Sequence, residues 1–209
     1  MAGSAGFFGS AAVLTTAVFL GKILGALYKI PLGNLLGSSG MAHFYAAYNV
    51  FNVLLLLSTA GLPVAISRLT AESNAMGRHG QVRRIFRTSL LLLTTIGLVC
   101  GGAMFLFPHV LANLLHDPLA AAGIRILAPS VGCICVMSAI RGYTQGLGDM
   151  LPTAVSQIIE SAAKLTVGLT ACVWLLKRGA AAETAAAGAI LGVTVGAALG
   201  LGYLLFTLR

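Results

Sequence analysis

Six long apolar stretches most constrain the fold of this chain. They run over Phe7–Ile30, Phe44–Ser67, Ile85–Phe107, Leu119–Ile140, Leu151–Leu176 and Thr184–Phe206. A helix needs about 20 apolar residues to cross roughly 30 Å of hydrocarbon, and each stretch is long enough. The residue alternation that a membrane β-barrel requires is absent from the sequence. The pattern therefore predicts an all-α, polytopic membrane protein in which residues 1–209 form one six-helix bundle.

The composition agrees with a membrane protein and argues against nucleic-acid binding. The chain is 58% hydrophobic and only 9% charged, whereas about a quarter of the residues in a soluble domain are charged. The net charge of +8 does not indicate a nucleic-acid partner, because no basic module rich in aromatic residues is present. Basic loops of a membrane protein instead fix its orientation.

The basic residues predict a cytoplasmic amino terminus. With that orientation, seven basic residues fall on the inner side and four on the outer side, and cytoplasmic loops usually hold the excess. The inner residues are Arg68, Arg78, Arg83, Arg84, Arg87, Arg141 and Arg209, and the outer ones are Lys29, Arg125, Lys177 and Arg178. We interpret the Arg-rich second loop as a topology determinant, with contact to anionic lipid head groups as the alternative.

The fifth stretch carries a polar stripe. Thr153, Ser156, Gln157, Glu160 and Lys164 recur every three or four residues and so share one face of a helix. A charged residue near the bilayer midplane costs roughly 2.5–3.5 kcal/mol and usually faces a protein interior or a watery cavity. Glu160 and Lys164 are spaced either for a local i, i+4 ion pair or for a site that couples a cation or binds substrate.

Further candidate binding residues lie in the first two stretches. Lys22 is about 12 Å from Ile30 by helical rise, which is too deep for easy snorkelling. Its depth resembles that of Lys164, so the two lysines suggest a shared site for an anionic group. Asn49 and Asn52 share one helix face and either bind sugar hydroxyls or hold helices together.

Glycine and proline predict where helices bend and where they pack closely. Gly61 and Pro63 should bend or break the second stretch near its inner end, a natural place for a hinge. Glycines recur every fourth residue in the sixth stretch, at Gly188, Gly192, Gly196 and Gly200. This ridge predicts close helix packing, within the bundle or against a partner.

No residue pattern indicates catalysis. The four cysteines lie inside apolar stretches without the spacing of a metal site or a disulfide framework. The glycines of the Arg141–Asp149 turn lack the strand and the lysine of a nucleotide-binding loop. No nucleophile–base arrangement or paired carboxylates stand out. We therefore expect no cofactor, no metal and no enzymatic activity.

Three motifs resemble one family of membrane proteins. Gly61-Leu-Pro-Val-Ala-Ile-Ser67, Arg141-Gly-Tyr-Thr-Gln-Gly146 and Pro152-Thr-Ala-Val-Ser-Gln-Ile-Ile-Glu160 together resemble the polysaccharide biosynthesis/stage V sporulation protein B family. That family belongs to the multidrug/oligosaccharidyl-lipid/polysaccharide exporter superfamily. Gly21-Lys-Ile-Leu-Gly25 is similar to the corresponding part of lipid II flippases.

The resemblance implies a flippase in a bacterial cytoplasmic membrane. Its substrates would be undecaprenyl-pyrophosphate-linked sugars such as the peptidoglycan precursor lipid II. Members have two pseudosymmetric six-helix lobes around a central cavity that opens alternately to either side. The resemblance places Lys22 among the cationic residues that line this cavity.

The chain also departs from the family pattern. Tyr28 stands where lipid II flippases often carry a second basic residue, and Leu54 and Leu55 replace further basic positions. The chain has the length of one lobe, so the resemblance identifies it as an amino-terminal half. A second six-helix lobe is therefore an expected partner, beside membrane lipids.

These observations support three hypotheses. In the first, a lipid-linked oligosaccharide flippase holds pyrophosphate with Lys22, then Lys164, with Arg141 at the inner mouth. Asn49, Asn52 and Gln157 would then contact the sugars and belong to the same substrate-binding site as these cations. In the second, a multidrug exporter is coupled to Na⁺ or H⁺ through Glu160. In the third, a non-transporting assembly subunit binds another membrane protein through the Gly188–Gly200 ridge.

Overall fold

The computed structural model describes the backbone of residues 2–208 and the side chains of residues 12–208, so Arg209 lies outside it. In chain order the helices are α1 (Ala2–Thr59), α2 (Leu62–Ala75), α3 (His79–Leu106), α4 (Pro108–Leu114), the 3₁₀ helix η1 (Pro118–Ala120), α5 (Ala121–Gly146), α6 (Leu151–Lys177) and α7 (Ala182–Thr207). No strand occurs among the described residues. The all-α prediction is therefore confirmed for this part of the chain.

The expected count of six separate spanning helices is not confirmed. Five helices of the described part are long and apolar enough to cross a membrane. The first of these covers Ala12–Ala75 and joins the first two predicted stretches. The physical reason is that the residues between these stretches, predicted as a loop, are helical almost throughout.

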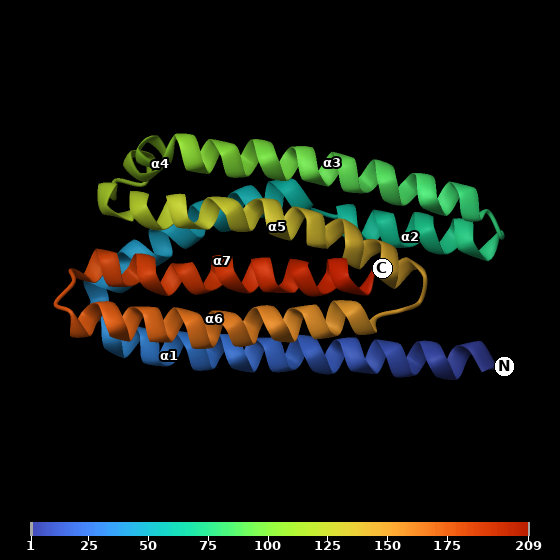
Figure 1. The fold of residues 1–209 in the computed structure, drawn as a ribbon, viewed down its shortest axis with the longest axis horizontal. Coiled ribbons are helices and arrows are strands. Elements are labelled where there is room, and N and C mark those ends of the chain that lie inside the picture. The colour runs from blue at the N-terminus through green and yellow to red at the C-terminus, as the bar shows by residue number, and fades with distance from the viewer. Residues whose placement is uncertain (1, 209) are drawn as a thin grey trace.

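The long helix α1 reverses its direction at Gly37. This glycine has φ 65° and ψ −171°, a backbone conformation that other residues rarely adopt. The rings of Tyr28 and Phe44 lie 6.2 Å apart, although residues 16 positions apart on a straight helix would be separated by about 24 Å. The two segments of α1 therefore pack against each other in opposite directions, as the dark and light blue parts of Figure 1 show.

A second break separates α1 from α2, where the sequence predicted it. The first helix ends at Thr59, Gly61 has φ 71°, and Pro63 lies in the first turn of α2. Proline suits a first turn because the backbone N–H that it lacks has no helical partner there. The predicted break near Gly61–Pro63 is confirmed, and the stretch Phe44–Ser67 is consequently not one helix.

The remaining helices form one bundle with its two ends clearly distinguished. The α2–α3 and α5–α6 connections lie at the end where Figure 1 places both chain termini. The α6–α7 connection, α4 and η1 lie at the opposite end (Figure 1). There, Nδ1 of His43 lies 2.7 Å from a carboxylate oxygen of Asp117 and so joins α1 to the segment before η1. Helix α5 continues through Pro129 without a break.

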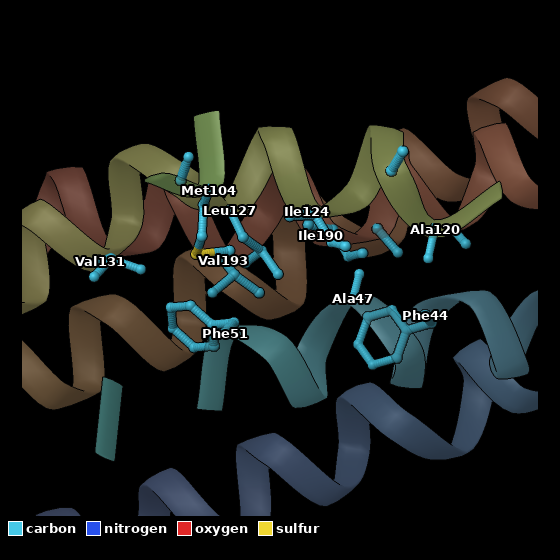
Figure 2. Close-up of a cluster of buried hydrophobic side chains, with 14 of the residues drawn as sticks. Phe44, Ala47, Phe51, Met104, Ala120, Ile124, Leu127, Val131, Ile190 and Val193 are labelled. Atoms are coloured by element: carbon cyan, nitrogen blue, oxygen red, sulfur yellow. The ribbon is translucent and has the colours of Figure 1, made fainter. Parts of the chain in front are cut away.

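The main apolar core lies between the second segment of α1 and helices α3, α5 and α7. Figure 2 shows Phe44 and Phe51 facing Ile124, Leu127 and Val193. These side chains are at most 4% exposed. This core fixes the second segment of α1 against the rest of the bundle.

The glycine ridge of α7 packs inside the bundle, against α6. A methyl group at Gly192 would approach the backbone nitrogen of Gly168 to 2.5 Å, and one at Gly196 would approach the carbonyl oxygen of Glu160 to 2.7 Å. Gly192, Gly196 and Gly200 are all buried. Close packing is therefore confirmed, and these glycines are covered by this chain rather than presented to a partner.

The outward faces of the bundle are strongly apolar. Leu56, Leu57, Leu91, Val99 and Phe206 are each at least 67% exposed. Large apolar side chains exposed on several helices are unusual for a soluble monomer, and lipid is the environment in which they are stable. The exposed faces thus agree with a protein that is integral to a membrane.

Gly192→Ala should destabilise the bundle by roughly 1–3 kcal/mol, because overpacking of a tight helix contact costs about that much. The free energy of unfolding can be measured by circular dichroism in mixed micelles with increasing SDS. Gly202→Ala on the same helix is the control, since its methyl group would meet no atom within 4 Å. Equal stability of the two variants would contradict this packing.

Candidate functional site

An open pocket of about 270 Å³ lies between α1, α5 and α6. Four of the residues that the sequence singled out line this pocket, although they come from three helices. The complete lining is Val18, Gly21, Lys22, Arg141, Gln157, Glu160 and Ser161. The polar stripe of α6 thus forms one wall, and the amino-terminal segment of α1 forms the other.

Arg141 is held in place by the polar stripe of α6. Its Nη2 donates to Oε2 of Glu160 at 3.1 Å, and its Nε donates to Oγ of Ser156 at 3.1 Å. The side chains of Arg141 and Glu160 are 15% and 27% exposed. At this depth, pairing removes most of the cost of keeping two charges away from water.

Glu160 is paired with Arg141 and not with Lys164. The i, i+4 ion pair with Lys164, one of the two alternatives for this spacing, is therefore not formed. The physical reason is that a guanidinium offers several donors to a carboxylate and to a neighbouring hydroxyl at once, while Lys164 has another partner. Only the tertiary approach of α5 to α6 brings Arg141 to Glu160.

Lys164 lies against two tyrosines. Its Nζ donates to the hydroxyl of Tyr48 at 3.0 Å and lies 4.9 Å and 5.4 Å from the ring centres of Tyr48 and Tyr28. A cation over aromatic faces gains about 0.5–2 kcal/mol. Lys164 does not belong to the pocket lining, so the structure does not bring it together with Lys22 in one pocket.

Lys22 is the cation that this pocket presents. It is exposed, and among the residues whose side chains are described it makes no ion pair. Because Arg141 and Glu160 neutralise each other, Lys22 gives the pocket one net positive charge. Such a site attracts an anionic group.

Gln157 contributes a polar atom that lacks a partner. Its Oε1 is buried and accepts no hydrogen bond from the described residues. An unpaired buried acceptor costs about 1–3 kcal/mol. A ligand that donates a hydrogen bond to this oxygen would remove that cost.

Asn49 and Asn52 are placed differently from the other predicted site residues. Both lie on the second segment of α1 and are exposed, and neither lines the pocket. They do not bind neighbouring helices through any hydrogen bond recorded for the described side chains. Their predicted contact with sugars therefore remains a prediction.

The three sequence motifs pack against one another, and residues of two of them line this pocket. A methyl group at Gly142 would approach the carbonyl oxygen of Pro63 to 2.7 Å, and one at Gly146 would approach that of Ser67 to 2.6 Å. On the side of α5 towards α6, Nε2 of Gln145 donates to Oγ1 of Thr153 at 3.3 Å. The Arg141–Gly146 motif thus packs α2 closely with its glycines and binds α6 with its polar side chains.

Sequence reasoning missed how Tyr28, Tyr48 and Ser156 act. Tyr28 is 1% exposed, and its hydroxyl donates to the carbonyl oxygen of Ala189 on α7 at 2.8 Å. The repeat spacing did place Ser156 on the polar stripe. No local signal connected Ser156 or Tyr48 to a charge on another helix.

Arg141→Gln and Glu160→Gln should be strongly coupled in a double-mutant cycle. Each single variant leaves one charge without its counter-ion, whereas the double variant leaves none. We expect a coupling free energy of about 1–3 kcal/mol, measured by unfolding in mixed micelles. Glu160→Gln combined with Lys177→Gln is the control, because Lys177 is exposed at the far end of α6. Additive effects of the first pair would contradict the ion pair.

Three relatives from Bacillus subtilis (strain 168) match most of this chain. The uncharacterized membrane protein YabM is 32% identical, over 90% of this chain and 35% of its own length. Stage V sporulation protein B is 31% identical, over 92% of this chain and 37% of its own length. Lipid II flippase MurJ is 28% identical, over 79% of this chain and 32% of its own length. The chain thus spans about a third of the length of these curated relatives.

The family assignment covers nearly the whole chain. The family described as polysaccharide biosynthesis protein matches residues 8–209, which include all three motifs and every residue that lines the pocket. The resemblance that those motifs indicated is confirmed. The chain belongs to the polysaccharide biosynthesis protein family.

Proposed function

We propose that this chain forms one lobe of a flippase for lipid-linked oligosaccharides, with undecaprenyl-pyrophosphate-linked sugars as the substrate class. The observation that carries the proposal is the net positive pocket between α1, α5 and α6, where Lys22 has no ion-pair partner among the described side chains and lies beside the Arg141–Glu160 ion pair. The family assignment and the lipid II flippase among the relatives support it.

A pyrophosphate suits this pocket because it matches the charges that are present. Lys22 supplies a point charge, and phosphate oxygens compete with the Glu160 carboxylate for the guanidinium of Arg141. Charge-assisted hydrogen bonds of this kind are about twice as strong as neutral ones. Displacement of Glu160 would then add a second cation to the site only while the substrate is bound.

The sugars would extend from the pyrophosphate to polar side chains. Gln157 offers a buried acceptor without a partner, which a sugar hydroxyl would satisfy. Asn49 and Asn52 offer further exposed amides if a sugar reaches the second segment of α1. Lys164 would act more indirectly, by holding Tyr28 and Tyr48 against α6.

Six membrane crossings account for the architecture of such a lobe. The two segments of α1 count as separate crossings, since the chain reverses at Gly37, and α3, α5, α6 and α7 supply the others. A second lobe would face the pocket across the substrate path. Bending at Gly61–Pro63, beside the closely packed Gly142, would accompany the change between inward- and outward-open states.

The charge distribution supports a cytoplasmic amino terminus in a bacterial plasma membrane. The α2–α3 connection lies at the end of the bundle that carries the termini (Figure 1). Arg78 lies in this connection, the arginines at positions 83, 84 and 87 lie in the first turns of α3, and Arg68 lies on α2. Basic residues are retained on the cytoplasmic side of a membrane protein. The pocket cations would then be reached by substrate from the inner leaflet.

The geometry gives less support to the two alternative hypotheses. A cation-coupled multidrug exporter needs a carboxylate that is available to a cation, but Glu160 is bound to Arg141 and lies near Lys22. An assembly subunit that docks through the α7 glycines needs that ridge on the surface, but α6 covers it.

Lys22→Ala should weaken the binding of lipid II to the chain in nanodiscs roughly tenfold, the equivalent of one charge-assisted contact of about 1.4 kcal/mol. It should also lower the amount of lipid II exposed on the outer leaflet of bacteria that depend on this protein for its translocation. Lys22→Arg should retain most of both activities. Native mass spectrometry and a surface-labelling assay measure the two effects.

Lys29→Ala is the matched control, because Lys29 lies on the same helix segment but over the ring of Tyr45, at 5.6 Å from its centre. It should leave lipid II binding unchanged. Unaltered binding and translocation by the Lys22→Ala variant would rule out the proposed role of the pocket.

A further inference from the structure

A second cavity, an apolar groove of about 490 Å³, opens on another face of the bundle between α3 and α5. Leu98 and Phe105 of α3, Pro129 and Val136 of α5, and Leu201 of α7 form its walls. Gly102 lies in it with no atom within 4 Å of the position that a Cβ would take. The groove shares no residue with the Lys22 pocket.

The groove extends along only one half of the membrane-crossing helix α3. It runs along α3 from Thr94, near the middle of the helix, to Phe105, next to its last residue. Eleven residues of helix rise about 16 Å, and half of the hydrocarbon core is about 15 Å thick. The length of the groove therefore matches the hydrocarbon of a single leaflet. A transmembrane helix of a partner would instead need a groove along all of α3.

A positive charge stands at the end of the groove where a head group would lie. The guanidinium carbon of Arg125 is 4.8 Å from the ring centre of Phe105, and Phe105 is the groove residue nearest to the end of α3. Arg125 is exposed and makes no ion pair with any described side chain. Asp117, in the neighbouring connection, is bound to His43. An anion at the membrane surface thus meets Arg125 without a competing carboxylate there.

We propose that this groove holds one acyl chain of an anionic phospholipid whose phosphate is bound by Arg125. An acyl chain in the bilayer is already out of water, so the hydrophobic effect does not favour its entry into the groove. The stabilisation comes instead from van der Waals contact between the chain and the walls of the groove. The cation then selects the head group, because a basic residue near the surface favours anionic lipid. This lipid is a resident component of the lobe and is distinct from the lipid-linked cargo.

Native mass spectrometry of the full chain from nanodiscs, titrated with phosphatidylglycerol or phosphatidylcholine, tests the proposal. The first phosphatidylglycerol should bind more tightly than the first phosphatidylcholine. Gly102→Leu, whose Cβ would meet no atom within 4 Å, places a bulky side chain in the groove and should remove this first adduct. Arg125→Gln should weaken phosphatidylglycerol roughly fivefold and leave phosphatidylcholine unchanged.

Two controls match these variants. Gly202→Leu places the same side chain on an exposed glycine of α7 that also has open space around it. Arg178→Gln removes an exposed arginine at the same end of the bundle, where it lies 3.7 Å from the ring centre of Trp174. Both controls should bind phosphatidylglycerol as the unaltered chain does.

Equal binding of the two lipids by the unaltered chain would overturn the head-group assignment. An unchanged first adduct in Gly102→Leu would overturn the acyl-chain assignment. If Gly102→Leu instead shifts the ratio of monomer to dimer with lipid binding unchanged, the groove is a protein interface and the proposal is wrong. None of these results depends on lipid II binding at Lys22, so the proposed flippase function is tested separately.

Discussion

The absence of water from the hydrocarbon core is the constraint on which this structure depends. Each polar group there needs a partner inside the protein, and the partners come from other helices. Arg141 of α5 pairs with Glu160 of α6, Lys164 of α6 binds Tyr48 of α1, and Tyr28 of α1 donates to the backbone of α7. These contacts join the helices at defined positions, whereas apolar packing in lipid alone has little positional preference.

Stable association of the helices also requires close packing, because the hydrophobic effect does not drive helix association within a membrane. The small residues of α7 bring its backbone against α6, and Gly142 and Gly146 bring α5 against α2. On α5, the polar side chains of Arg141 and Gln145 point towards α6, on a different side of the helix from Gly142 and Gly146. One short motif can therefore fix a backbone contact on one side and a charged site on the other, which explains why Arg141 and Gly142 stand next to each other.

The two cavities follow from these same rules but differ in character. The pocket at Lys22 is polar and lies where the stripe of α6 faces the amino-terminal segment of α1. The groove at Phe105 is apolar and lies along the α3–α5 contact, where Gly102 leaves open space in front of it. The first suits the charged part of a lipid-linked substrate, and the second suits a lipid chain. Their separation on the bundle places the proposed cargo site and the proposed lipid site on different faces.

The sequence by itself determined the helical class, the positions of most helices, the break at Gly61 and the polar stripe of α6. These features are local, since they depend on the length of apolar runs, on repeat spacing and on the backbone preferences of glycine and proline. Only the tertiary structure decided the reversal at Gly37, the choice of Arg141 rather than Lys164 as the partner of Glu160, and the separation of Lys164 from Lys22. Each of these depends on which helices approach one another, and repeat spacing along one helix carries no information about the side chains of the next.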